Sequence, residues 1–129
     1  MSAAHLIARL REQRNTWLVL REAEADMPEL AVCLRRPPEA DLPDFRPTAD
    51  KPLHQLLAES VCKAVVGWRG FTEADLLGSA VGSSDAVDFH PDLWAEVVRD
   101  RSDWLNRCAA HLMECINAHI AARAEQRKN

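Results

Sequence analysis

One stretch of the sequence decides how the rest of the chain is arranged. It reads Val65-Val66-Gly67-Trp68-Arg69-Gly70-Phe71-Thr72-Glu73-Ala74-Asp75-Leu76-Leu77. Gly67 and Gly70 bracket a Trp-Arg pair, and Thr72 and Asp75 have the spacing of a capping box at the start of a helix. We therefore predict that one apolar helix ends at Gly67, that a turn with aromatic anchors follows, and that a second helix starts beyond it. The stretch contains no catalytic motif.

The composition is that of one small globular domain. The 129 residues are enough to bury one hydrophobic core, and an apolar content of 47% is ordinary. The formal charge of -4, with no Lys or Arg between Gly70 and Val98, argues against nucleic-acid binding. No apolar run approaches the roughly 20 residues that span a bilayer, and the N-terminus lacks a secretory signal pattern. We therefore expect a cytoplasmic protein with neither a nucleic-acid nor a membrane partner.

The N-terminal residues 2–14 are predicted to form a short amphipathic helix. Leu6, Ile7 and Leu10 fall on one side of it, whereas its arginines fall mostly elsewhere. Asn15 is a candidate end for this helix.

Residues 16–35 fit a β-hairpin. Its two arms, 16–21 and 29–35, are enriched in aromatic and branched residues and flank a polar segment. The alternative continues the first helix through Ala25, because Trp17 also lies at helical spacing from the leucines that precede it.

The remainder of the chain is predicted to be mainly helical. Residues 37–52 contain five prolines and should form a connector, because proline removes backbone donors and favours extended geometry. Residues 53–123 then form the helical part, and residues 124–129 a frayed, charged tail. The sequence therefore predicts one α+β domain over residues 1–129, predominantly α-helical, with a small N-terminal β-hairpin.

A helix start is predicted at Pro91. Proline suits the first helical position, which makes His90 the capping residue. Phe89 and Trp94 then have the positions of a hydrophobic staple. The preceding residues 78–88 are rich in Gly, Ser and Asp and should form an exposed loop.

One group of side chains has the chemistry of metal ligands. It lies on the last predicted helix and comprises Cys108, His111, Cys115 and His119. Adjacent pairs could share an ion, but the first and last members are about 16 Å apart by helical rise, so the four cannot bind one ion. No Cys-x-x-Cys motif elsewhere completes a site. We therefore expect no metal and no cofactor, and four reduced, widely spaced cysteines.

The polar groups of the acidic region form no catalytic motif. Two carboxylate pairs lie there: Glu73 with Asp75, and Asp85 with Asp88. Acid-base catalysis would need a pocket that separates the pKa values of a pair, and the sequence predicts none. The serines of the loop that follows Leu77 lack the spacing of a nucleophile elbow. We therefore predict a protein without catalytic residues.

Protein contacts are the remaining source of function. Four tryptophans are many for this length, and most should belong to the core. Trp and Arg are the residue types that anchor interfaces, so Trp68 and Arg69 are the first candidates for a binding site. Phe71 and Trp17 are the further candidates.

Three segments carry a resemblance to a known family. They are Leu34-Arg35-Arg36-Pro37-Pro38-Glu39-Ala40-Asp41-Leu42-Pro43, Val66-Gly67-Trp68-Arg69-Gly70-Phe71-Thr72-Glu73-Ala74-Asp75-Leu76-Leu77 and Val87-Asp88-Phe89-His90-Pro91-Asp92-Leu93-Trp94. In order and spacing over residues 16–123, the chain resembles the tail assembly chaperones of long-tailed bacteriophages and prophages.

The resemblance implies a non-enzymatic protein that works in the host cytoplasm. Such a protein binds the tape measure protein and keeps it soluble while tail tube subunits polymerise around it. Contact with the tail tube protein and formation of a homo-oligomer stay open. The alternatives are a small helical regulatory or interaction protein of a prophage with a protein partner, and an uncharacterised enzyme.

Overall fold

Three antiparallel strands form the centre of the fold, in the order β1-β2-β3. The strands are β1 (Asn15–Arg21), β2 (Leu30–Arg35) and β3 (Val65–Arg69). The structure is a computed structural model that describes residues 1–128. It confirms the α+β class and the predicted hairpin near the N-terminus. The alternative, a first helix that continues through Ala25, is wrong because α1 (Ala3–Glu12) ends before β1 begins.

Strand β3 corrects the prediction for residues 53–123, which are not helical throughout. The chain leaves α2 (Leu53–Ala64) and enters a strand directly, with Trp68 paired to Val32. Val65 and Val66 are β-branched and favour the extended backbone. The buried strand β2 also needs hydrogen-bonding partners on both of its edges, and β3 supplies the second edge.

The predicted turn is shifted by this strand. Gly67 lies inside β3 and pairs with Cys33, so it does not end a helix. The turn falls at Gly70 instead, where φ is 81° and a Cβ would stand 1.8 Å from the carbonyl oxygen of Glu29. Only glycine fits there, because both the backbone angle and the close approach exclude a side chain.

Local signals for helix starts are confirmed. The Thr72 hydroxyl accepts from the Asp75 backbone N–H and the Asp75 carboxylate accepts from the Thr72 N–H, which completes the capping box of α3 (Glu73–Leu77). His90 caps α4 (Pro91–Arg99) through its ring nitrogen.

The last helix, α5 (Ser102–Lys128), is longer than predicted. It continues through residues 124–128, which were expected to form a frayed tail; residue 129 of that prediction lies outside the described residues. This end of the helix contains neither Gly nor Pro and is made of strong helix formers, so the helix continues without tertiary support.

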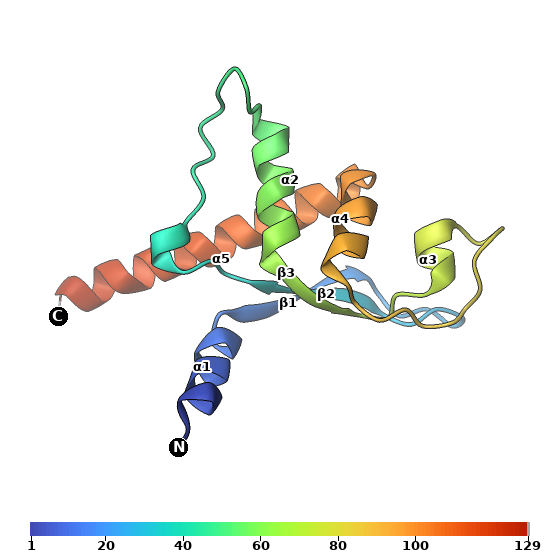
Figure 1. The fold of residues 1–129 in the computed structure, drawn as a ribbon, viewed down its shortest axis with the longest axis horizontal. Helices are drawn as coiled ribbons and strands as arrows, with labels where there is room; N and C mark the ends of the chain where they lie inside the picture. Colours follow the sequence, from blue (N-terminus) through green and yellow to red (C-terminus); the bar gives the residue numbers. More distant parts are fainter. Residues whose placement is uncertain (129) are drawn as a thin grey trace.

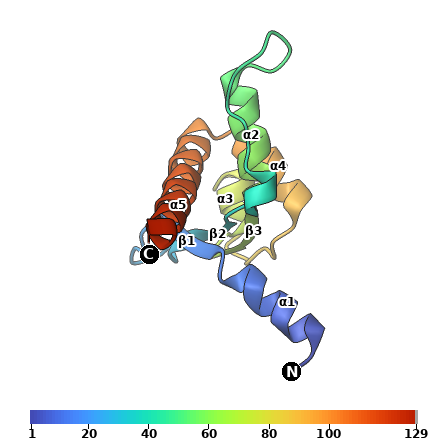
Figure 2. The same ribbon diagram turned by 90° about the vertical axis from the view of Figure 1, so that its left-hand side faces the viewer.

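The molecule has two layers, with helices α2, α4 and α5 on one face of the sheet (Figure 1). The core lies between these layers and includes Leu30, Val32 and Leu34 from β2. Trp94 from α4 and Leu112 from α5 close it from the helical side. Helix α1 lies on the opposite side of the sheet and projects away from the body (Figure 2).

Candidate functional site

The outer face of the sheet carries none of the three core helices. Strand alternation and register place two rows of side chains on this face. The rows are Trp17–Cys33–Gly67 and Val19–Ala31–Arg69. We call these six residues the open face.

Trp17 and Arg69 are the exposed members of the open face, and the fold brings them together. The Trp17 side chain is 46% exposed, and the Arg69 guanidinium carbon lies 4.5 Å from the centroid of its ring. The two residues belong to the two edge strands, with β2 between them. Arg69 also forms an ion pair with Glu29 at 2.7 Å. The result is an amphipathic pair of the kind that anchors protein interfaces.

Small residues beneath the pair make this approach possible. Ala31 and Cys33, on the intervening strand, are 0% and 5% exposed. Gly67 on β3 has no side chain, so the space beside Cys33 stays open. A Cβ at Gly67 would have Cys33 Cβ, at 3.9 Å, as its nearest neighbour. Burial raises the pKa of the Cys33 thiol, which keeps it protonated at neutral pH and makes it a weak nucleophile.

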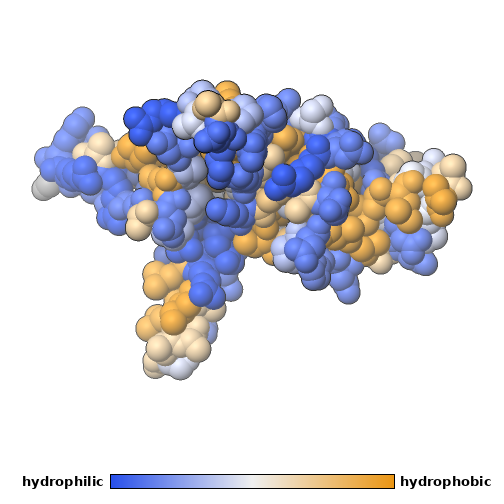
Figure 3. Space-filling view, turned by 45° about the horizontal axis from the view of Figure 1, so that its top comes forward, coloured by the Kyte–Doolittle hydropathy of each residue, from blue (hydrophilic) through white to orange (hydrophobic). Residues whose placement is uncertain are grey.

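Helix α1 adds an exposed apolar stripe on the same side of the sheet. Leu6, Ile7 and Leu10 are 46%, 48% and 58% exposed, and the helix has no buried residue (Figure 3). Only Gln13 and Arg14 separate α1 from β1, so the helix cannot fold back onto the sheet face beside it. The sequence predicts the amphipathic pattern of this helix, but the pattern does not reveal that its apolar side is uncovered.

Of the other two predicted anchors, Phe71 is buried in the core and Trp68 is partly buried and packs against it. Phe71 is 1% exposed, and the Trp68 ring stacks on it with centroids 4.3 Å apart. Trp68 Nε1 donates to the Val87 carbonyl oxygen at 2.7 Å. The rings of Phe89 and Trp94, the predicted staple, both pack edge-on against Trp68. Trp68 points inward because alternation along β3 places it opposite to Arg69.

The Cys and His side chains of α5 separate into different environments. Cys108 is fully buried, and burial raises the pKa of its thiol to about 12. His111 Nε2 lies 2.8 Å from Thr16 Oγ1, whereas His119 Nε2 lies 2.6 Å from a carboxylate oxygen of Glu39. In the part of the chain that the structure describes, no three His, Cys, Asp or Glu side chains are grouped as metal ligands.

Asp75, a member of one of the two carboxylate pairs, has a structural role. A groove of about 1070 Å³ separates the β1–β2 turn from α3 and contains Asp75. Burial would raise the pKa of Asp75, but hydrogen bonds from Arg21 and Thr72 outweigh it and hold the pKa below its ordinary value. Asp75 is therefore an ionised helix cap and ion-pair partner, with no second carboxylate bonded to it.

Comparison of the chain with family models, with curated proteins and with solved structures finds no match. Within residues 1–128, no helix has the length and apolar content needed to cross a membrane. The open face and the apolar stripe of α1 are thus the surfaces of this protein that are suited to binding a partner.

Proposed function

We propose that this chain is a non-enzymatic binding protein that holds an apolar segment of a polypeptide partner against α1 and the open face. The observation that carries this proposal is the exposure of Leu6, Ile7 and Leu10 on α1 and of Trp17 on the open face. A ten-residue helix with no buried residue is marginally stable in water, so a partner that covers its apolar stripe would stabilise it.

The partner that we propose is the tape measure protein of a long-tailed bacteriophage or prophage. The protein would then act as a tail assembly chaperone in the bacterial cytoplasm. The support is the resemblance over residues 16–123, together with a surface suited to the task. A carrier for a long apolar polypeptide needs an exposed apolar surface on a body with a net charge, and the chain carries a formal charge of -4.

Coexpression with the tape measure protein encoded in the same phage or prophage genome tests the proposal. We expect the tape measure protein to move from the insoluble to the soluble fraction and to copurify with the chain. Failure of the unmodified chain to bind or solubilise it would refute the chaperone assignment.

A matched pair of variants tests the proposed surface. Leu6→Glu places a charge in the α1 stripe, and Leu53→Glu places the same charge at the start of α2; both leucines are 46% exposed. Only Leu6→Glu should reduce the soluble yield of the tape measure protein, because a buried unpaired carboxylate at an interface is costly. Equal effects of the two variants would remove α1 from the site.

A further inference from the structure

The charges of this chain are segregated along its sequence. Segments 22–34 and 70–98 contain ten of the 20 Asp and Glu residues and none of the 16 Lys and Arg residues. In the fold, residues of the β1–β2 turn and of the α3 region line one groove and so lie at the same end of the molecule (Figure 1). We call residues 22–28 and 73–88 the acidic end.

Most carboxylates of the acidic end have no cation. Asp75 pairs with Arg21. Within residues 1–128, the six others have no Lys or Arg nitrogen within 4.0 Å: Glu22, Glu24, Asp26, Glu73, Asp85 and Asp88. Arg21 and Arg101 line the same groove, so two cations stand against the seven carboxylates and the acidic end keeps a net negative charge.

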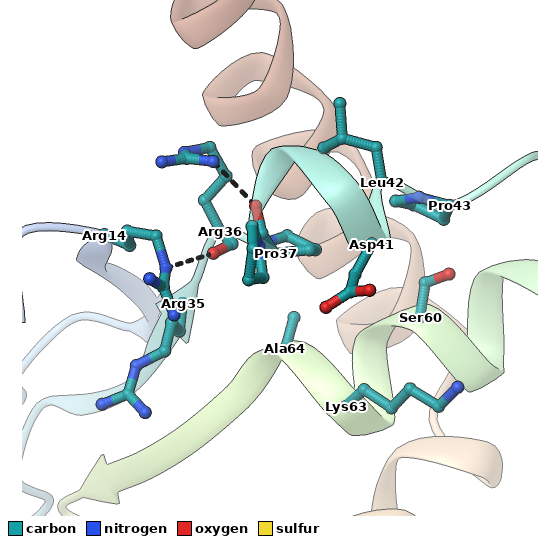
Figure 4. Close-up of a pocket in the computed structure, with 11 residues that line it drawn as sticks. Arg14, Arg35, Arg36, Pro37, Asp41, Leu42, Pro43, Ser60, Lys63 and Ala64 are labelled. Carbon is teal, nitrogen blue, oxygen red and sulfur yellow. Dashed lines mark hydrogen bonds between the residues drawn. The ribbon is translucent and has the colours of Figure 1, made fainter. Parts of the chain in front are cut away.

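A basic cleft of about 570 Å³ lies at the other end of the sheet (Figure 4). Arg14, Arg35 and Arg36 line one side, and Lys63 of α2 lines the other. No carboxylate lies within 4.0 Å of any of these four cations in the described part of the chain. Asp41 is the one acidic residue of the lining.

Neutral oxygens hold the three guanidinium groups in place. Arg14 Nε donates to the Arg36 carbonyl oxygen at 3.1 Å, and Arg36 Nη1 donates to the Pro37 carbonyl oxygen at 2.7 Å. Arg35 Nε donates to the Asn15 side-chain oxygen at 2.8 Å. Burial and, next, the charge of Arg14 lower the pKa of Arg36. Among the described residues no carboxylate is bonded to these cations, although Asp41 lines the cleft and the charge of Glu39 partly offsets the lowering of the pKa of Arg36. Each guanidinium retains N–H groups for an external anion.

The basic cleft and the acidic end of one molecule cannot meet. Leu30 and Arg35 are the two ends of β2, which at a rise of about 3.3 Å per residue separates the two charged regions by roughly 17 Å. The strand is the buried centre of the sheet and pairs on both edges, which fixes this separation. The carboxylates of the acidic end can therefore reach a basic cleft only in a second molecule.

We propose that the basic cleft binds the acidic end of a second copy of this chain, in a head-to-tail arrangement. Exposed carboxylates of one copy would accept hydrogen bonds from the guanidinium groups of the next, which match carboxylates in a bidentate fork. This contact is heterologous, so it leads to rings or open chains rather than to a two-fold dimer. It uses neither α1 nor the open face and therefore does not depend on the proposed chaperone function.

Analytical ultracentrifugation of the full chain tests the self-association. At an ionic strength of about 0.02 M, we expect the average mass to rise above the monomer mass of 14.5 kDa with increasing protein concentration. At about 0.5 M salt, where charges are screened over a few ångströms, the mass should return to that of the monomer. A monomer at every concentration in low salt would overturn the proposal.

Charge reversal identifies the two surfaces. Arg35→Glu with Arg36→Glu should weaken association at least about tenfold, and so should Glu24→Arg with Asp26→Arg. Arg46→Glu is the control, because the Arg46 side chain is 89% exposed and bound only to Asp44. Circular dichroism melting verifies that each variant is folded.

Mixing the two double variants gives the decisive result. Neither double variant should associate alone, but an equimolar mixture should. The unmodified acidic end of the Arg35→Glu, Arg36→Glu variant can bind the unmodified cleft of the Glu24→Arg, Asp26→Arg variant. Association that persists in the cleft variant would overturn the proposal. So would binding of inorganic phosphate to the cleft of a chain that stays monomeric, since that result would assign the cleft to a small anion.

Discussion

Arg69 places its guanidinium carbon 4.5 Å from the ring centroid of Trp17, although the two residues lie on opposite edge strands and 52 positions apart in sequence. The contact joins the edges of the open face across the small side chains of β2. Both residues stay accessible in this contact. Trp17 is 46% exposed, and the Arg69 side chain is 52% exposed.

Replacement of Arg69 should separate binding from folding. Arg69→Ala is expected to lower the free energy of unfolding by about 1 kcal/mol or less, since its ion pair with Glu29 and its contact with Trp17 are solvent-exposed. The same variant should weaken binding of the tape measure protein by about 1 to 3 kcal/mol. Urea unfolding and a binding titration measure the two effects. Arg46→Ala is the control, and an unchanged affinity for Arg69→Ala would remove this residue from the site.

Trp94 should carry much of the stability of the core. Trp94 is 0% exposed, so Trp94→Ala is expected to lower the free energy of unfolding by about 3 to 5 kcal/mol. Its ring nitrogen has no hydrogen-bond acceptor among the described residues, so Trp94→Phe should cost clearly less. Chemical denaturation of both variants gives the comparison. Equal losses would show that the indole nitrogen contributes a bond that the structure lacks.

Proline at the centre of the sheet should unfold the protein. Val32→Pro removes a donor from the strand that pairs on both edges, where proline is not tolerated. Ser79→Pro is the matched control, because Ser79 follows Gly78 in an exposed turn closed by the bond from the Val81 N–H to the Gly78 carbonyl oxygen. Thermal melting followed by circular dichroism distinguishes them. A wild-type melting temperature for Val32→Pro would contradict the central position of β2.

Asp75 should make the free energy of unfolding depend on pH in the acid range. Burial raises its pKa, but the hydrogen bonds from Arg21 and Thr72 outweigh this and the folded-state pKa lies below the unfolded value. The carboxylate therefore stabilises the fold above the unfolded pKa of about 3.9, and this contribution is lost as the pH falls through the folded pKa. Asp75→Asn should lower stability at neutral pH by about 1 kcal/mol or more and flatten the acid side of the stability curve. Urea unfolding across the acid range measures both, and an unaltered pH dependence in Asp75→Asn would assign the acid sensitivity to other groups.

Neither the candidate site nor the charged cleft could be read from the sequence as a unit. Trp17 and Arg69 are both predicted anchors, but their contact depends on β3, where the sequence predicts a helix end and a turn. Trp68 and Phe71 are aromatic candidates for anchors just as Trp17 is. Strand alternation and the turn at Gly70 nevertheless direct their side chains toward the core. Arg35 and Lys63 face one cleft only because α2 returns to the end of β2.

The sequence favoured the β1–β2 hairpin over a longer first helix, and by itself it determined the capping box of Thr72 and Asp75 and the helix start at His90 and Pro91. The two helix starts depend on residues a few positions apart, so short-range spacing contains the information. The tertiary structure alone decided that Val65–Arg69 is a strand, that Trp68 packs against the core and that Arg69 is exposed. The physical reason is that a strand is stabilised by hydrogen bonds to partners distant in sequence, and here the unpaired edge of β2 supplied them.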